Sequence, residues 1–150
     1  MQITFGKHAG KDARKVLFDD PAYVRWVLDQ TGAIGAMLAA QKEFKRLISS
    51  IDQKPFVGAC ASQCKRAVTR TTAYQNSSTL YAWCDECNPH SLGAEAGKLR
   101  IVKTYADAER HVALTCKGNK ATLKQIIREL AQEKGMGSRF TAAAMTAFLP

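Results

Sequence analysis

The amino-acid sequence predicts an α+β fold, and three observations carry this prediction. Apolar residues recur every three or four positions over 33–51 and 119–134, which is the spacing of a helix with one buried face. Between these stretches, 66–74 and 79–83 are rich in β-branched and aromatic residues and flank the turn QNSS, as the strands of a hairpin do. Two pairs of cysteines flank the same hairpin. Helices before and after a small central sheet are therefore expected.

The chain divides into three segments where this pattern changes. Lys54-Pro55 ends the second helical stretch, because proline disfavours a helical conformation at the residue before it. We expect a helical module at 1–54, a zinc ribbon with a β-hairpin or three-stranded sheet at 55–105, and a helical segment at 106–150 that packs on the ribbon.

The N-terminal segment is expected to begin with a short strand at 2–5 and a glycine turn, while 11–18 remains ambiguous. Asp20 and Pro21 suit the N-cap and the first position of a helix that ends at Gly32. The helix over 33–51 is expected to bury the apolar stripe Ile34, Met37, Leu38, Phe44, Ile48 and Ile51.

After the hairpin, 98–105 alternates in side-chain character and is predicted to be a third strand. A helical turn or two is expected over 107–114. The clearest helix of the chain is predicted over 119–134, with an apolar face and Gly135 after it. The last segment, 138–150, is predicted to be helical as well.

The chain of 150 residues has a net charge of +9, from 22 basic and 13 acidic side chains. The three segments each contribute +3, so the excess belongs to the folded surface and favours a polyanionic partner, most often nucleic acid. The N-terminus lacks the apolar region of a secretory signal, and no apolar run approaches the ~20 residues of a membrane span. We therefore expect a cytoplasmic protein with no membrane partner.

Four of the five cysteines form two closely spaced pairs, CASQC before the hairpin and CDEC after it. Because the strands are antiparallel, both pairs are expected at the same end of the hairpin. Four thiolates there suit tetrahedral Zn²⁺, and in a reducing compartment a metal site is favoured over a redox dithiol or disulfides, which remain alternatives. The predicted ligands are Cys60, Cys64, Cys84 and Cys87.

Two residues inside the second pair, Asp85 and Glu86, argue against a reactive dithiol, because carboxylates oppose thiolate formation. His90 or Cys116 remains an alternative fourth ligand, although Cys116 is better interpreted as a buried thiol. A closed site with four cysteines has no open coordination position, so it stabilises a sheet and does not catalyse.

The N-terminal stretch FGKHAGK, followed by DDPAYVRWVL, resembles the small C-terminal module of exodeoxyribonuclease X-like proteins over residues 3–30. The pattern is F-G-K-x-x-G, a short spacer, and a P-x-Y-x-x-W helix. The matching residues are Phe5, Gly6, Lys7, Gly10, Pro21, Tyr23 and Trp26. The resemblance implies a nucleic-acid-associated accessory module, while the nuclease activity does not carry over because the exonuclease domain is absent.

Two basic elements are candidates for contact with nucleic acid. In the first, Lys7, Lys11 and Arg14 surround the glycine turn, whose backbone N–H groups suit a phosphate. The second lies on the ribbon, where arginines beside an aromatic residue can hold a phosphate backbone and stack on an unpaired base. Its residues are Lys65, Arg66, Arg70 and Tyr74.

Together these features predict a zinc-containing nucleic-acid-binding accessory or recognition protein, with DNA preferred over RNA as partner. No enzymatic activity is expected, because the carboxylates are scattered and the three histidines show no motif spacing. The alternative is a non-catalytic protein-interaction subunit of a larger nucleoprotein complex of the phage, plasmid or CRISPR-type defence kind, with the alanine-rich final segment as a docking element.

Overall fold

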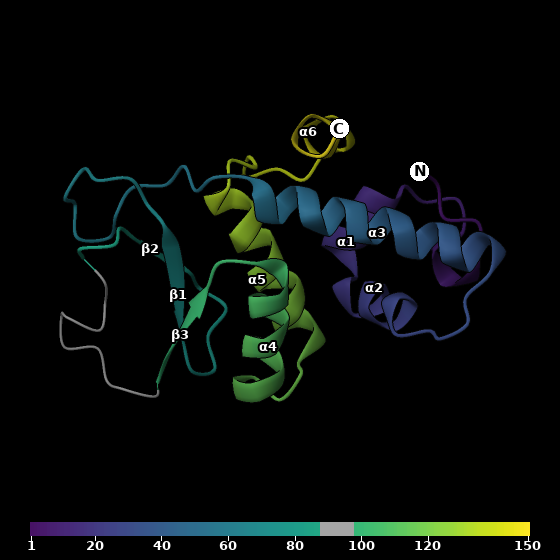
Figure 1. Ribbon diagram of the computed structural model, residues 1–150, viewed down its shortest axis with the longest axis horizontal. Helices are drawn as coiled ribbons and strands as arrows, with labels where there is room; N and C mark the ends of the chain where they lie inside the picture. The colour runs from purple at the N-terminus through teal and green to yellow at the C-terminus, as the bar shows by residue number, and fades with distance from the viewer. Residues whose placement is uncertain (88–97) are drawn as a thin grey trace.

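The computed structural model describes residues 1–87 and 98–150, and within them it confirms the α+β class. Helices lie before and after a three-stranded antiparallel sheet (Figure 1). The elements in chain order are a 3₁₀ turn η1 (Gly6–His8), α1 (Ala13–Asp19), α2 (Pro21–Leu28), α3 (Gly35–Gln53), β1 (Arg70–Tyr74), β2 (Tyr81–Trp83), β3 (Leu99–Val102), α4 (Tyr105–Thr115), α5 (Lys120–Glu133) and α6 (Ala142–Phe148).

The first helices begin where capping side chains occur. Asp12 accepts a hydrogen bond from the Arg14 N–H at the start of α1, and Asp20 accepts one from the Tyr23 N–H at the start of α2. The predicted strand at 2–5 is wrong, because Gln2 forms only an isolated bridge with Asp12. Helix α2 ends at Leu28, before the predicted end at Gly32.

The buried face of α3 differs from the predicted stripe. Phe44 and Ile51 are buried as expected, but Ile34 is 82% exposed and Leu38 is 38% exposed. Ile34 precedes the helix as its N-cap, and Leu38 lies on its first turn. The polar residue Gln41 is buried instead, because its side-chain amide donates hydrogen bonds to the carbonyls that end α2 and start the connection to α3.

The sheet has the order β2-β1-β3, and all of its strands are shorter than predicted. β1 begins at Arg70, so residues 66–69 of the predicted strand lie outside it. Upstream of them, Gln63 and Lys65 take left-handed backbone conformations, with φ of 62° and 60°. β3 ends at Val102 because Thr104 and Asp107 form a capping box that starts α4. Helix α4 is consequently an 11-residue element, longer than the one or two turns expected.

One hydrophobic core joins the helices to one face of the sheet. Ala73, Leu80 and Val102 contribute to it from the sheet side, while α4 packs on β3 and α5 packs on α1 and α2. Helices α4 and α5 therefore lie between the sheet and the N-terminal helices (Figure 1). Among the described residues, no helix combines the length and the apolar character needed to cross a membrane.

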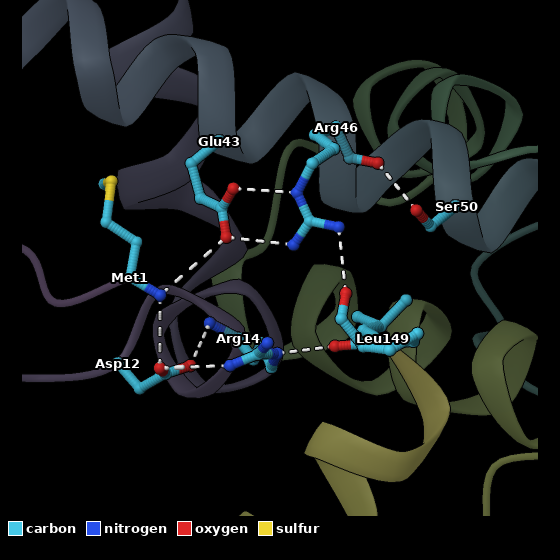
Figure 2. Close-up of polar contacts among 8 residues, drawn as sticks. Met1, Asp12, Arg14, Glu43, Arg46, Ser50 and Leu149 are labelled. Atoms are coloured by element: carbon cyan, nitrogen blue, oxygen red, sulfur yellow. Dashed lines mark hydrogen bonds and ion pairs between the residues drawn. The ribbon is translucent and has the colours of Figure 1, made fainter.

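The last helix, α6, is held against the N-terminal helices. Met145, Phe148 and Leu149 are buried in the common core, so the apolar side of this helix is already occupied. Figure 2 shows the polar contacts around its end: Arg14 donates to the Leu149 carbonyl, and Arg46 donates to the Pro150 carbonyl at 2.9 Å. The alanines Ala142, Ala143 and Ala147 of the same helix remain exposed.

Candidate metal centre

Two short loops bring the four paired cysteines to the same end of the sheet. Cys60 and Cys64 precede β1, while Cys84 and Cys87 follow β2, and the antiparallel pairing of these strands places both pairs together. The first loop is also held against β2, since the Ala61 N–H donates to the Ala82 carbonyl at 2.8 Å. We call the resulting group of four thiols the cysteine cluster.

The geometry of the cysteine cluster suits a metal ion. Its four Sγ atoms all lie within 4.8 Å of one another, and the Sγ atoms of Cys64 and Cys84 are 3.4 Å apart. Thiolates bound to one tetrahedral ion through bonds of ~2.3 Å have Sγ atoms about 3.8 Å apart. A disulfide requires about 2.05 Å between sulfurs, and all four thiols are free. The four side chains could therefore share one metal ion.

The electrostatics of the cluster also favour a cation. A hydrogen bond with Ser62 lowers the pKa of Cys60 to about 6, and the backbone N–H of Arg66 lowers the pKa of Cys64. A hydrogen bond with Ser62 also acts to lower the pKa of Cys87, but its thiol neighbours Cys64 and Cys84 outweigh this and raise it to about 11. Deprotonation of Cys87 therefore calls for a positive ion beside it.

The first loop reaches this arrangement without the glycine that often follows a metal-binding cysteine pair. Lys65, directly after Cys64, takes the left-handed conformation with φ of 60°. In the second loop, the Cys87 N–H donates to the Cys84 Sγ at 3.3 Å. N–H groups that point at sulfur stabilise the thiolate form, as metal binding requires.

The other cysteine and the nearby carboxylates do not enter the cluster. Cys116 caps the end of α4, where its Sγ lies 3.8 Å from His111 Nε2, and it is not part of the group of four. His90, the other alternative ligand, lies outside the described residues. Asp85 and Glu86 are exposed and form ion pairs with Arg70 and Arg66. Arginines thus compensate both carboxylates, and the case for a metal rests on the four thiols themselves.

Three of the predicted ribbon residues, Lys65, Arg66 and Arg70, lie beside the cluster, whereas Tyr74 does not. Arg70 Nη2 lies 2.6 Å from Asp85 Oδ1, and Arg66 Nη1 lies 2.9 Å from Glu86 Oε2. Lys65 is exposed, and Tyr74 at the far end of β1 is 48% exposed. The indole N–H of Trp83 donates to Thr72 Oγ1 at 2.8 Å on the sheet.

The predicted residues of the glycine turn lie at the opposite end of the molecule from the ribbon (Figure 1). Lys7 Nζ is 2.7 Å from Asp20 Oδ2, and Lys11 Nζ is 3.2 Å from His8 Nδ1. Arg14 is directed toward the end of the chain, where it donates to the Leu149 carbonyl (Figure 2). The two basic elements therefore do not form one continuous surface.

Local packing explains two residues of the N-terminal pattern, Gly6 and Tyr23. Gly6 has φ of +64°, and a Cβ at this position would lie 2.7 Å from the Tyr23 hydroxyl oxygen, so a larger residue is strained there. Tyr23 packs edge-on against His8, with ring centroids 4.7 Å apart. Trp26, the last residue of the pattern, is 48% exposed.

Asp20 is expected to make the stability of this turn depend on pH. Partial burial acts to raise its pKa, but hydrogen bonds from Lys7 and His8 outweigh burial and lower the pKa from 3.8 to about 2. The charged form is thus favoured in the folded state, so its contribution is complete above the unfolded value of 3.8 and is lost as pH falls through 2. We expect Asp20→Asn, which keeps a capping side chain, to cost on the order of 2 kcal/mol near neutral pH.

The measurement is urea unfolding of both proteins at a series of pH values. The difference between wild type and Asp20→Asn should shrink between about pH 4 and pH 2. A difference that stays constant over this range would show that the Asp20 charge does not stabilise the fold.

Sequence reasoning missed two further residues of the ribbon surface, Tyr81 and Ile101. Both pair with Thr72, on either side of β1, and both are exposed, at 44% and 39%. The position of Tyr81 follows from the hairpin register, which the turn QNSS and the alternation of 79–83 indicate. The position of Ile101 depends on which edge of the hairpin the third strand joins, and no local pattern contains this information.

Comparisons of the chain with models of protein families, with curated proteins and with solved structures found no match. The chemistry of the site is therefore argued from its own residues, and the resemblance of residues 3–30 to the exodeoxyribonuclease X-like module stays a prediction.

Proposed function

We propose that this chain is a zinc-containing nucleic-acid-binding accessory protein. The observation that carries the proposal is the cysteine cluster, with four thiols within 4.8 Å of one another at one end of an antiparallel sheet that also bears basic side chains. A metal held there fixes both cysteine loops. Lys65 and Arg66 directly follow the first of them, and Arg70 begins β1.

Zinc is the metal that this donor set favours. Four cysteine thiolates in a tetrahedral arrangement are typical of structural Zn²⁺ sites, and a site filled by four protein ligands has no position left for a substrate. We therefore assign the metal a structural role and the chain no catalytic activity. Four thiolates and one Zn²⁺ add −2 to the formal charge of +9, which leaves the protein at about +7.

The ribbon residues are the proposed phosphate contacts. Arg66 and Arg70 are paired with exposed carboxylates, and exposed ion pairs are worth at most about 1 kcal/mol, so a phosphate can replace the carboxylate at little cost. Lys7 and Lys11 are proposed as a separate, weaker contact region. Arg14 is not proposed as a phosphate contact. Its guanidinium donates to the Leu149 carbonyl and pairs with Asp12, so it holds the C-terminal residues in place.

The N-terminal pattern indicates which class of nucleic acid is bound. Its resemblance to a module found beside exonuclease and helicase domains supports DNA over RNA, and a recognition role beside a separate catalytic protein. The four-thiol site supports a reducing compartment such as the cytoplasm.

One observation favours the alternative, a protein-interaction subunit of a larger nucleoprotein complex. Trp26, Ile34 and Leu38 expose apolar side chains on α2 and the start of α3, at 48%, 82% and 38%. Exposed large apolar side chains are typical of surfaces that a partner protein covers. This alternative predicts that the isolated chain does not bind nucleic acid at low salt.

The proposal is tested by metal analysis and by nucleic-acid titrations at several salt concentrations. We expect one zinc per chain, and binding whose log K falls linearly with log salt, by about 0.7 per phosphate contacted on a single strand. Arg66→Gln should reduce this slope, whereas Arg139→Gln, an exposed arginine far along the chain from the ribbon, should not. Absence of binding to DNA and RNA at low salt would remove the proposal.

A further inference from the structure

The outer face of the sheet is an aromatic surface that the core does not use. Along β1, Thr71 and Ala73 point into the core, so Thr72 and Tyr74 lie on the opposite face. Tyr81 and Ile101 lie on this face too, because each pairs with Thr72 in the register. Tyr74, Tyr81 and Ile101 are 48%, 44% and 39% exposed, although they are large apolar or aromatic residues. We call these three exposed residues the open face; Thr72, between Tyr81 and Ile101 in the register, is itself buried.

The aromatic rings of the open face are held in position. The rings of Tyr74 and Tyr81 pack edge to face, with centroids 6.3 Å apart. The half-buried indole of Trp83 is fixed by its hydrogen bond to Thr72. Rings that are already ordered lose little conformational entropy when a flat ligand group stacks on them.

A basic pocket continues the open face around the β3 edge of the sheet. It has a volume of about 270 Å³ and contains one carboxylate beside its basic groups; its lining residues are Leu99, Arg100, Ile101, Asp107, Arg110 and His111. Ile101 also belongs to the open face, so the two surfaces are contiguous. Arg100 Nε is buried and has no hydrogen-bond partner among the described residues. Arg110 Nη1 lies 3.9 Å from Asp107 Oδ1, and among the described residues Arg110 forms no other ion pair.

We propose that the open face and the β3-edge pocket together bind single-stranded nucleic acid. Unpaired bases stack on Tyr74 and Tyr81, and a backbone phosphate enters the pocket between Arg100 and Arg110. This inference rests on the proposed nucleic-acid-binding function and names its substrate as a single strand.

The chemistry of the surface favours this ligand over a duplex or a protein. A duplex keeps its base faces stacked inside, so it cannot cover tyrosine rings on a flat sheet, whereas unpaired bases present them. A protein partner would cover the apolar residues, but it would not account for an adjoining pocket with two arginines and an unsatisfied buried donor. The formal charge of the chain, +9 without metal, also complements a polyanion.

The test compares the intact metal-bound chain and its variants with an oligodeoxythymidylate of about 15 nucleotides and with a DNA duplex of the same length. We expect the single strand to bind more tightly than the duplex. Tyr74→Leu and Tyr81→Leu remove the ring and keep an apolar side chain, and each should weaken single-strand binding by about 5-fold or more. Tyr74→Phe and Tyr81→Phe keep the ring and should bind as the wild type does.

Two matched controls separate stacking from general effects. Trp26→Leu removes an aromatic ring that is equally exposed, at 48%, but lies on α2, and it should leave binding unchanged. Arg110→Gln should lower the salt slope by about 0.7, the value for one lost phosphate contact on a single strand, and Arg139→Gln should not. Metal content and circular dichroism identify any leucine variant that does not fold, and the phenylalanine and Arg110 variants then still decide the question.

The outcomes distinguish this inference from the function on which it rests. Salt-dependent binding with equal affinity for both DNA forms, or binding that the leucine and Arg110 variants leave unchanged, would overturn the open-face inference and keep the proposed function. Binding of the single strand that Trp26→Leu weakens as much as Tyr74→Leu does would also overturn it. Absence of any binding would remove both.

Discussion

Removal of the metal is expected to unfold the cysteine-bearing end of the sheet and leave the helices folded. Cys60, Val68, Ala82 and Cys84 form a small hydrophobic cluster of their own, separate from the main core. The inner face of the sheet belongs to the main core through Ala73, Leu80 and Val102, and the helices supply most of that core. In small zinc domains, metal binding contributes about 10–16 kcal/mol, so a cluster of this size is not expected to stay ordered without it.

This prediction can be measured with one tryptophan as a reporter. Trp26→Phe leaves Trp83, whose indole donates to Thr72, as the single tryptophan of the chain. Chelation should shift its fluorescence to longer wavelength, while the helical circular dichroism signal changes little. Cys84→Ser should give the same spectrum without chelator and lose the bound metal.

The matched control is Cys116→Ser, because Cys116 is buried on α4 and does not belong to the cysteine cluster. It should retain one metal per chain and the fluorescence of the parent protein. Loss of metal in Cys116→Ser, or full retention in Cys84→Ser, would contradict the assignment of the four ligands.

Phe18→Ala is expected to destabilise the helical core by about 3–5 kcal/mol, a large share of the 5–15 kcal/mol that a typical domain has. Phe18 is fully buried on α1, and its ring packs edge-on against Phe140, with centroids 5.0 Å apart. The Arg128 guanidinium covers the Phe140 ring and donates to the Phe18 carbonyl. Truncating Phe18 therefore leaves a cavity where α1, α5 and the segment before α6 meet.

Urea unfolding followed by circular dichroism measures this loss. The control is Ile34→Ala, since Ile34 is 82% exposed and its truncation should change the free energy of unfolding by less than about 0.5 kcal/mol. At low temperature Phe18→Ala should still bind one metal per chain. A small effect for Phe18 with a large one for Ile34 would show that the core is not arranged as described.

Local patterns were sufficient for much of this fold. The helices that begin at Pro21 and Lys120 start after capping residues, and α5 is followed by Gly135, so short-range signals predicted them closely. The joining of the four thiols also followed from the sequence, because two cysteine pairs around an antiparallel hairpin can only meet at one of its ends. The identity of the fold class needed nothing beyond these elements.

Side-chain exposure was less predictable. Ile34, Leu38 and Trp26 have the apolar character and spacing of core residues, yet all three are exposed. Gln41 is buried because two carbonyls from another segment accept its hydrogen bonds. Periodicity reports which residues share a face, but it does not report whether another element covers that face.

The sequence by itself determined the α+β class, the basic charge and the two cysteine pairs, because each depends on composition or on residues close together in the chain. Only the tertiary structure decided that the basic glycine turn and the ribbon lie at opposite ends, and that Arg14 binds the C-terminal residues. It also brought β3 and α4 together with the hairpin, which creates the open face and its pocket. These surfaces combine residues distant in sequence, and their contacts depend on how the elements pack.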